Sequence, residues 1–352
     1  MGILSVRKAV ILVAAMTAVF TVGVTWAGGA EESDEHHHEQ EEEHHHDGAM
    51  SLPHIEPADL GDGESLNVVA STSIVGDVVR QVAGSAATVD VLMPVGQNPH
   101  AYEPTPREMT RVEDAYIAFV NGLDLEEGLM DSIEDVAGSY VVPVSAGIPV
   151  LGADDGGHDH DHGHDDDHGH AGGDPHFWFD PTNVITWTEN IAEALSEADP
   201  SNRSTYEERR DAYIAELEAL DQEIRREVSS IPRDRRKLVV DHVALTYFAD
   251  EYGFEIIGEV IPSVSDQAEP SPRHIARLAE VVQEEGVSAI FIGQTAGSGL
   301  RNLVDSVAEE VGREIRIVEL LTGSLAAEGN RGDSYLEFMR FNTEQIVPAL
   351  NP

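Results

Sequence analysis

Short apolar runs alternate with segments of helical periodicity along most of this chain, starting at Leu66. Runs typical of strands occur at 66–71, 87–94, 116–122 and 140–145, and again at 237–242, 254–261, 287–294 and 314–320. The segments between these runs carry apolar residues at the spacing of an amphipathic helix. Because strands that alternate with helices form parallel sheets, we expect an α/β protein with two Rossmann-like lobes.

A long segment between the two halves has a different pattern. Its apolar positions keep helical spacing from about residue 201 until Pro232 stops the helix: Tyr206, Tyr213, Ile214, Leu217, Leu220 and Ile224. This helix is too long for a routine crossover within a small sheet. We therefore expect a linking helix at 201–231, between an N-terminal lobe at 66–200 and a C-terminal lobe at 232–352.

The N-terminal residues have the composition of a targeting segment and a leader. Arg7 and Lys8 precede an apolar run that reaches about Val24, and small residues follow at 27–29. We expect a cleaved signal peptide at 1–27 and export to the periplasm. Residues 28–65 include HHHEQEEEHHH at 36–46 and few apolar positions, which predicts a flexible acidic, His-rich leader.

Composition excludes several classes of function. The formal net charge is -45, and it becomes about -47 once Arg7 and Lys8 are removed with the signal peptide, which rules against nucleic-acid binding. The scattered acidic residues favour adaptation to a saline habitat, whereas those interleaved with histidine favour cation handling. The chain has no cysteine, so disulfides, thiolate metal sites and a cysteine-linked lipid at the end of the signal are excluded.

Three isolated histidines are the best candidates for chemistry. His100 lies in a Pro-rich loop after a strand, His176 lies between the His-rich tract and a helix, and His242 ends a strand of the second lobe. Ligands of open α/β sheets bind at the carboxyl ends of strands, and neutral imidazole is the commonest protein ligand for transition metals. Each histidine alone is more often a hydrogen-bonded or packed residue. Asp174 and Asp180 are placed to orient His176.

A tract of His, Asp and Gly separates the first two of these histidines. We expect a disordered loop at 152–173 whose imidazoles bind metal weakly and whose function is to raise the local metal concentration. The accessory ligands would be His158, His160, His162, His164, His168 and His170. A solvated linker without metal is the alternative.

Four motifs, in the same order along the chain, resemble those of the periplasmic metal-binding components of zinc and manganese ABC transporters. They are NPHAYEPTP, DPHFWFDP, VVDHVALTYFADEYG and GDSYLEFMRFN, and the resemblance covers about residues 66–350. It implies two α/β lobes joined by a rigid helix, with a metal site in the interlobe cleft. It also implies His100, His176 and His242 as ligands, a membrane permease as partner, and no enzymatic activity. We expect a monomer.

The resemblance also implies zinc as cargo, because manganese-preferring relatives tend to carry a carboxylate at the third ligand position, where this chain has His242. Mn²⁺ stays an alternative. Many relatives carry an Asp as fourth ligand at the position that matches Gly323. Here a water, Glu259, Asp266 or Asp333 would fill that role.

Two further functions suit the same residues. Three histidines and a water would also serve a zinc hydrolase, although the chain lacks an HExxH helix and an obvious general base beside any of the three. A metal-buffering or adhesive surface protein would use the His-rich tracts as its main sites.

Overall fold

The computed structural model describes residues 50–61, 63–134, 139–152 and 172–351. The described residues all belong to one compact unit, so both lobes lie within it. The predicted signal peptide at 1–27, most of the leader and the accessory histidines 158–170 lie outside the described residues.

The first lobe is a four-stranded parallel sheet in the order β2-β1-β3-β4. Its elements are β1 (Leu66–Ala70), α1 (Ser73–Ala83), β2 (Ala87–Val91), α2 (Pro106–Glu113), β3 (Ile117–Val120), α3 (Glu127–Glu134) and β4 (Tyr140–Pro143). The central strands β1 and β3 are almost fully buried, as expected for a parallel sheet covered on both faces.

The second lobe repeats this arrangement with the order β6-β5-β7-β8, again all parallel. Its elements are β5 (Lys237–Val240), α6 (Thr246–Tyr252), β6 (Glu255–Glu259), α7 (Pro272–Glu284), β7 (Ala289–Gly293), α8 (Ser298–Val311), β8 (Arg316–Leu320) and α9 (Tyr335–Leu350). The α/β class with two sheets, expected from the alternation, is confirmed.

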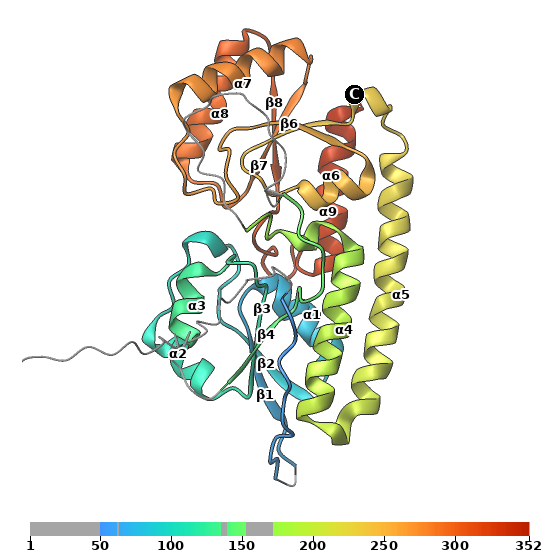
Figure 1. The fold of residues 1–352 in the computed structure, drawn as a ribbon. Coiled ribbons are helices and arrows are strands. Elements are labelled where there is room, and N and C mark those ends of the chain that lie inside the picture. The colour runs from blue at the N-terminus through green and yellow to red at the C-terminus, as the bar shows by residue number, and fades with distance from the viewer. Residues whose placement is uncertain (1–49, 62, 135–138, 153–171, 352) are drawn as a thin grey trace, which may run out of the picture. The chain divides into compact units, whose positions relative to one another are not determined.

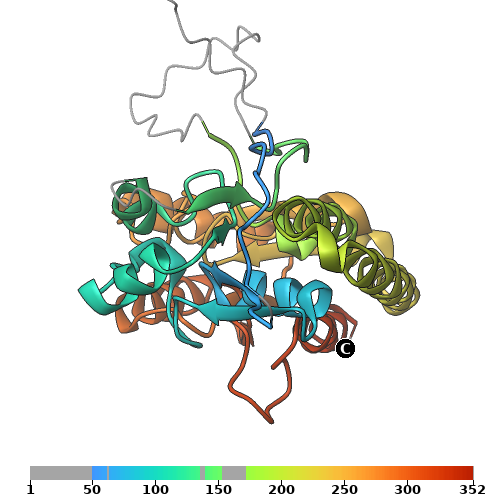
Figure 2. The ribbon, with the colours of Figure 1, turned by 90° about the horizontal axis from the view of Figure 1, so that it is seen from below.

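Two helices connect the lobes. After α4 (Pro181–Ala198) the chain turns at Asp199 and Pro200 into α5 (Arg203–Val228), a helix of 26 residues. The rise of an α-helix makes α5 about 39 Å long. Figures 1 and 2 show α4 and α5 along one side of the two sheets, and α5 packs against α1 of the first lobe and α9 of the second. The predicted linking helix is therefore present.

The lobes share contacts, most of them buried, close to the carboxyl ends of their strands. Trp178 of the first lobe donates from Nε1 to the carbonyl of Thr322, and the Tyr335 hydroxyl donates to the carbonyl of Trp178. Gly96 N donates to Ser324 Oγ at 2.7 Å. One core cluster contains residues of both sheets, so the interface between the lobes is part of the main core.

The end of the predicted leader differs from expectation. Residues 50–61 lack regular secondary structure but lie against the first lobe. Ile55 is 2% exposed, its amide donates to Glu197 of α4, and Ala58 N donates to the carbonyl of Ala198. The prediction of flexibility up to residue 65 is wrong here, because Ile55 is part of the core, Met50, Leu52 and Leu60 pack against it, and a few hydrogen bonds hold the backbone of this short extended segment.

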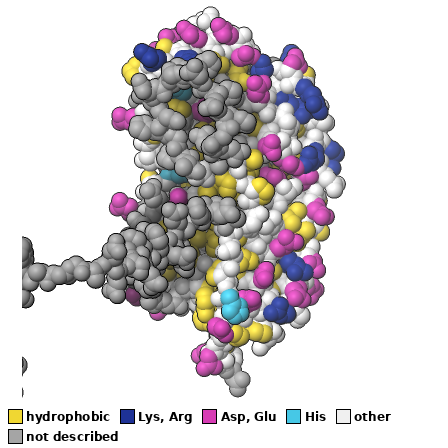
Figure 3. All heavy atoms as spheres, in the orientation of Figure 1, with side chains coloured by type: hydrophobic (Ala, Val, Ile, Leu, Met, Phe, Trp, Pro, Cys, Tyr) yellow, Lys and Arg dark blue, Asp and Glu magenta, His cyan; other side chains and the backbone are white. Residues whose placement is uncertain are grey.

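Acidic side chains are scattered over the face seen in Figure 3, among basic and apolar ones, rather than gathered in one patch. None of the described helices has the length and apolar character needed to cross a bilayer.

Candidate metal centre

The three predicted histidines meet between the lobes. His100 lies in the 3-10 turn Pro99–Ala101 that follows β2, and the side chain of Asn98 accepts a hydrogen bond from His100 N and so caps this turn. His176 lies between β4 and α4, directly before a turn of three aromatic residues, and His242 follows β5. Each histidine thus stands beyond the carboxyl end of a strand, where the loops of an α/β sheet carry ligand-binding groups.

Their ring nitrogens are close enough to share one ion. The Nε2 atoms of His100 and His176 are 3.0 Å apart, and one ring nitrogen of each of the three histidines lies within 4.8 Å of the others. Two nitrogens bound tetrahedrally to Zn²⁺ stand about 3.3 Å apart, given Zn–N bonds of about 2.0–2.1 Å. Within the described residues, this is the single group of histidines and carboxylates that meets such a criterion.

His176 is held in place by Asp174 and by Trp178. Asp174 Oδ1 lies 2.7 Å from His176 Nδ1 and also accepts the His176 backbone amide at 2.9 Å. The Trp178 ring meets the imidazole edge to face, with the ring centroids 5.1 Å apart. Since a carboxylate accepts the proton on Nδ1, the lone pair of Nε2 is left for a ligand.

His242 has the same kind of support from its sequence neighbour. Asp241 Oδ1 lies 2.8 Å from His242 Nδ1 and accepts the His242 amide, while Asp241 Oδ2 accepts the amide of Gly293 at the end of β7. The carboxylate therefore joins the ends of two strands to one imidazole. Sequence reasoning did not identify Asp241; an acid one or two residues before each of His176 and His242 was the available signal.

Burial and charge set the protonation of these groups. Burial lowers the pKa of His176, and the attraction of Asp174 only partly opposes this effect. Burial acts in the same direction on His242, but Asp241 and, further away, Asp266 outweigh it and raise the pKa of His242. Burial disfavours the charged form of Asp174 and of Asp241. The neighbouring histidines outweigh this effect and lower the pKa of both carboxyl groups. Two buried anions thus stand behind a cluster of imidazoles, which favours a cation in front of them.

A buried carboxylate of the first lobe holds the backbone around His176. Glu126 accepts from the Ser71 hydroxyl and from the amide of Asn121, so it joins the ends of β1 and β3. The Asn121 side-chain amide then donates to the carbonyl of Pro175, the residue before His176.

The predicted oxygen ligands lie outside the cluster. A Cβ on Gly323 would stand 2.6 Å from Pro99 Cδ, so the ring of Pro99 fills the space where a side chain would begin. Asp266 accepts from Asn98, Asp333 accepts from the amide of Gly329, and Glu259 lies near His274. None of these carboxylates belongs to the group of potential ligands among the described residues.

The other predicted orienting residue has a different role. Asp180 accepts the amide and hydroxyl of Thr182 and caps α4. The interpretation of Asp180 as a partner of His176 is therefore wrong, because its carboxylate is used by the first turn of the following helix.

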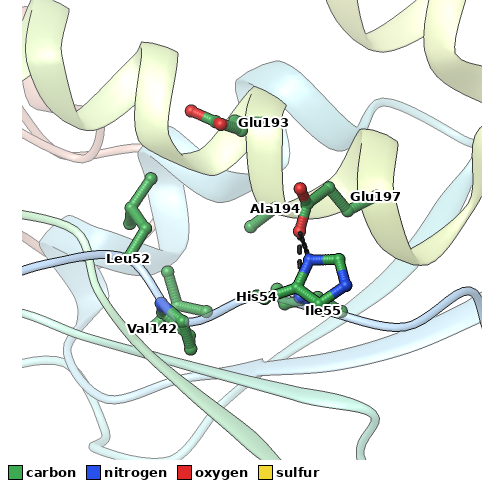
Figure 4. A pocket seen from close by; sticks show the side chains of 8 residues that line it. Leu52, His54, Ile55, Val142, Glu193, Ala194 and Glu197 are labelled. Carbon is green, nitrogen blue, oxygen red and sulfur yellow. Dashed lines mark hydrogen bonds and ion pairs between the residues drawn. The ribbon is translucent and has the colours of Figure 1, made fainter.

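A second histidine with acidic neighbours lies at the outer edge of the first lobe. His54 Nδ1 is 3.6 Å from Glu197, beside a cavity of about 220 Å³ between the 50–56 segment and α4 (Figure 4). The side chain of His54 is 76% exposed, and Glu197 hydrogen-bonds to the amide of Ile55 instead. This contact anchors the segment and does not form a second metal centre.

The sequence matches a known protein family and is similar to several characterised metal-binding lipoproteins. Residues 68–349 match the family model described as zinc-uptake complex component A, periplasmic. The chain is 32% identical over 290 residues to the manganese-binding lipoprotein MntA of Halalkalibacterium halodurans, covering 82% of this chain and 90% of the relative. It is 30% identical over 297 residues to the iron ABC transporter substrate-binding lipoprotein MtsA of Streptococcus pyogenes serotype M1, covering 82% and 89%.

Solved structures of periplasmic metal-binding proteins have a similar fold. The periplasmic zinc-binding protein TroA from Treponema pallidum superposes with a TM-score of 0.72 at 28% identity, covering 82% of this chain and all of that one. A manganese-bound periplasmic metal-binding protein from Candidatus Liberibacter asiaticus gives a TM-score of 0.70 at 25% identity, covering 81% and 100%. The chain therefore belongs to the zinc-uptake component A family, the extracytoplasmic metal-binding components of ABC transporters, which are binding proteins and not enzymes.

Proposed function

We propose that this protein captures Zn²⁺ in the periplasm and delivers it to an ABC permease for import, with His100, His176 and His242 as the ligands. The observation that carries the proposal is the convergence of three ring nitrogens from two lobes within 4.8 Å of one another. Two of these imidazoles are buried and held by buried carboxylates, an arrangement common behind zinc-bound histidines.

The donor set favours zinc over manganese, the ion named in the relative MntA. Imidazole suits Zn²⁺, whereas Mn²⁺ prefers carboxylate, carbonyl and water oxygens. The cluster offers three nitrogens and no carboxylate among the described residues. Pro99 packs against Gly323, so this position supplies no oxygen ligand. A water would complete a tetrahedral site.

The position of the ligands also suggests how cargo is held and released. His100 and His176 belong to the first lobe and His242 to the second, so a bound ion ties the lobes together. Release requires that these ligands separate, and docking of the protein as a monomer on the permease would supply that separation.

Calorimetric titration of the metal-free protein, with residues 158–170 deleted so that weak sites do not interfere, tests the proposal. One tight Zn²⁺ per chain is expected, with Mn²⁺ at least about 100-fold weaker. His242→Ala should weaken zinc binding by about two to three orders of magnitude, if the ~10–16 kcal/mol of a four-ligand zinc site is shared about equally.

His54→Ala is the matched control, because it removes an exposed imidazole that the structure places outside the cluster. It should bind zinc as the parent does. Unchanged zinc affinity in His242→Ala would exclude the interlobe site, and tighter binding of Mn²⁺ than Zn²⁺ by the parent would exclude zinc as cargo.

We also propose that the accessory histidines 158–170 collect zinc weakly and raise its concentration near the cluster. The alternation of imidazole and carboxylate in HDHDHGHDDDHGH supports this role. Deletion of 158–170 should remove weak zinc sites and leave the tight one. Loss of the tight site on deletion would contradict the proposal.

A further inference from the structure

One polar contact between the lobes stands beside the histidine cluster. Asn98 of the first lobe donates from Nδ2 to both carboxylate oxygens of Asp266, at 2.7 and 2.9 Å. Asp266 belongs to the segment between β6 and α7 of the second lobe. The pair therefore joins two loops that lie 168 positions apart in the sequence.

The same amide acts on the first ligand. Asn98 Oδ1 accepts the hydrogen bond from His100 N at 3.1 Å and so begins the turn that carries this histidine. Pro99, the residue between them, is buried against Gly323 of the second lobe. Movement of Asn98 away from Asp266 would therefore be transmitted directly to the position of His100.

The pair also lies at a part of this interface that faces open space. Asn98 and Asp266 are both half-buried and line a cavity of about 540 Å³ next to the first turn of α8. Several other contacts between the lobes are buried, including Ser73 with Ser324 and Trp178 with the carbonyl of Thr322. Because water reaches the pair, its hydrogen bonds can exchange without exposing the core.

We propose that Asn98 and Asp266 are positioning residues that form a clasp between the lobes and set the rate at which the bound ion leaves. While the clasp is closed, His100 stays beside His176 and His242. When it opens, the turn of His100 is free to move with its lobe, and the site loses one ligand. This inference rests on the proposed function, since it describes how that same site retains its cargo.

Three variants separate the clasp from other roles of the two residues. Asn98→Asp places two carboxylates against each other while the new side chain still caps the His100 turn, since aspartate is as good an N-cap as asparagine. Asp266→Asn removes the charge. The double variant restores an amide opposite a carboxylate with the two lobes exchanged.

Each protein is loaded with Zn²⁺ and mixed rapidly with an excess of chelator to measure zinc dissociation. Asn98→Asp should release zinc about tenfold faster than the parent or more, because like charges at contact distance repel. Zinc dissociation should be accelerated less in Asp266→Asn, and the dissociation rate of the double variant should be within about twofold of that of the parent. Association rates should change little throughout.

The matched control is Glu269→Gln, which removes a carboxylate from the same cavity and should leave the rate unchanged. Equal rates in the parent and all three variants would overturn the clasp, and so would a double variant as fast as Asn98→Asp. Loss of tight binding in both proteins that carry the Asp266→Asn change, with tight binding retained in Asn98→Asp, would instead make Asp266 a ligand. Failure of the proposed function itself would appear earlier, as a parent that takes up no zinc.

Discussion

Two of the three histidines each lie next to a carboxylate that the chain supplies one or two residues earlier. Asp174 and Asp241 bond to Nδ1 of their histidines and to the histidine backbone amides as well. A double contact of this kind fixes both the ring and the loop that bears it. These two imidazoles are thereby oriented before any ion arrives, which lowers the entropic cost of binding.

Asp241→Asn tests this orientation. The amide keeps the shape of the side chain but removes the charge that stabilises the His242 Nδ1 proton. Loss of such a partner typically weakens metal affinity about 10–100-fold, and we expect a loss in that range for Zn²⁺. Competition against a chelator of known affinity measures it. Asp250→Asn, on the exposed side of α6, is the control; equal affinities for the two variants would show that Asp241 does not orient His242.

The close packing of Gly323 against Pro99 leads to a prediction about the effect of a larger side chain. Because a Cβ there would approach Pro99 Cδ to 2.6 Å, Gly323→Ala must push the turn of His100 away from the second lobe. Overpacking of this kind costs about 1–3 kcal/mol, and where the cost falls on the zinc-bound form alone it corresponds to a loss of about 5- to 150-fold in zinc affinity. Gly299→Ala, where a Cβ meets nothing within 4 Å, serves as the matched control. A parent-like zinc affinity for Gly323→Ala would mean that the substitution costs the metal-free and zinc-bound forms equally and does not displace His100 as a ligand.

At the scale of elements, the strand ends place every ligand. The sequence predicted these strands to within a few residues, because short apolar runs alternate with segments of helical spacing. The three histidines were predictable individually for the same reason. Their proximity was expected only from the resemblance to a known family, because it depends on how two separate sheets pack, and no local pattern encodes that packing.

Long-range hydrogen bonds account for the rest of what the sequence did not predict. The short segment around Ile55 docks on α4 through Glu197, which lies 142 positions away. The clasp residue Asn98 and its partner Asp266 are similarly remote. Glu197 is an ordinary residue for a helix, and Asn98 and Asp266 are ordinary residues for loops. The sequence around each of them therefore does not indicate its long-range contact.

Glu126, which joins the ends of β1 and β3, yields a prediction about the pH dependence of stability. Burial raises the pKa of Glu126 above its ordinary value of 4.5, against the hydrogen bonds from Ser71 and Asn121. At pH values between 4.5 and the pKa of Glu126 in the folded state, the folded protein thus binds more protons than the unfolded chain. The stability that Glu126 contributes is therefore fully present below pH 4.5. It is lost as the pH rises through the pKa of Glu126 in the folded state.

Urea unfolding of the parent and of Glu126→Gln over a range of pH tests this sign. The free energy of unfolding of the parent should fall relative to that of the variant as pH rises above 4.5. Glu103→Gln, an exposed change on the same lobe, is the matched control. A parent that gains stability relative to Glu126→Gln over this range would show that Glu126 is favoured as an anion.

For the whole molecule, the cluster makes the metal a cross-link between two halves of one core. The lobes already share apolar contacts and buried hydrogen bonds such as that of Trp178 with Thr322, so they are associated without an ion. The ion adds a further tie between the two lobes. Its contribution to stability should depend on ligands from both lobes at once.

Thermal unfolding of the protein with residues 158–170 deleted measures this contribution. Free Zn²⁺ at about 1,000 times the Kd should add about 4 kcal/mol, which raises the Tm of a chain of about 300 residues by about 6 °C. His242→Ala leaves only the two ligands of the first lobe, so it should lose most of this shift, whereas His54→Ala should keep it. If His242→Ala kept the full shift, zinc would be stabilising the first lobe alone, and the ion could not be the link between the two.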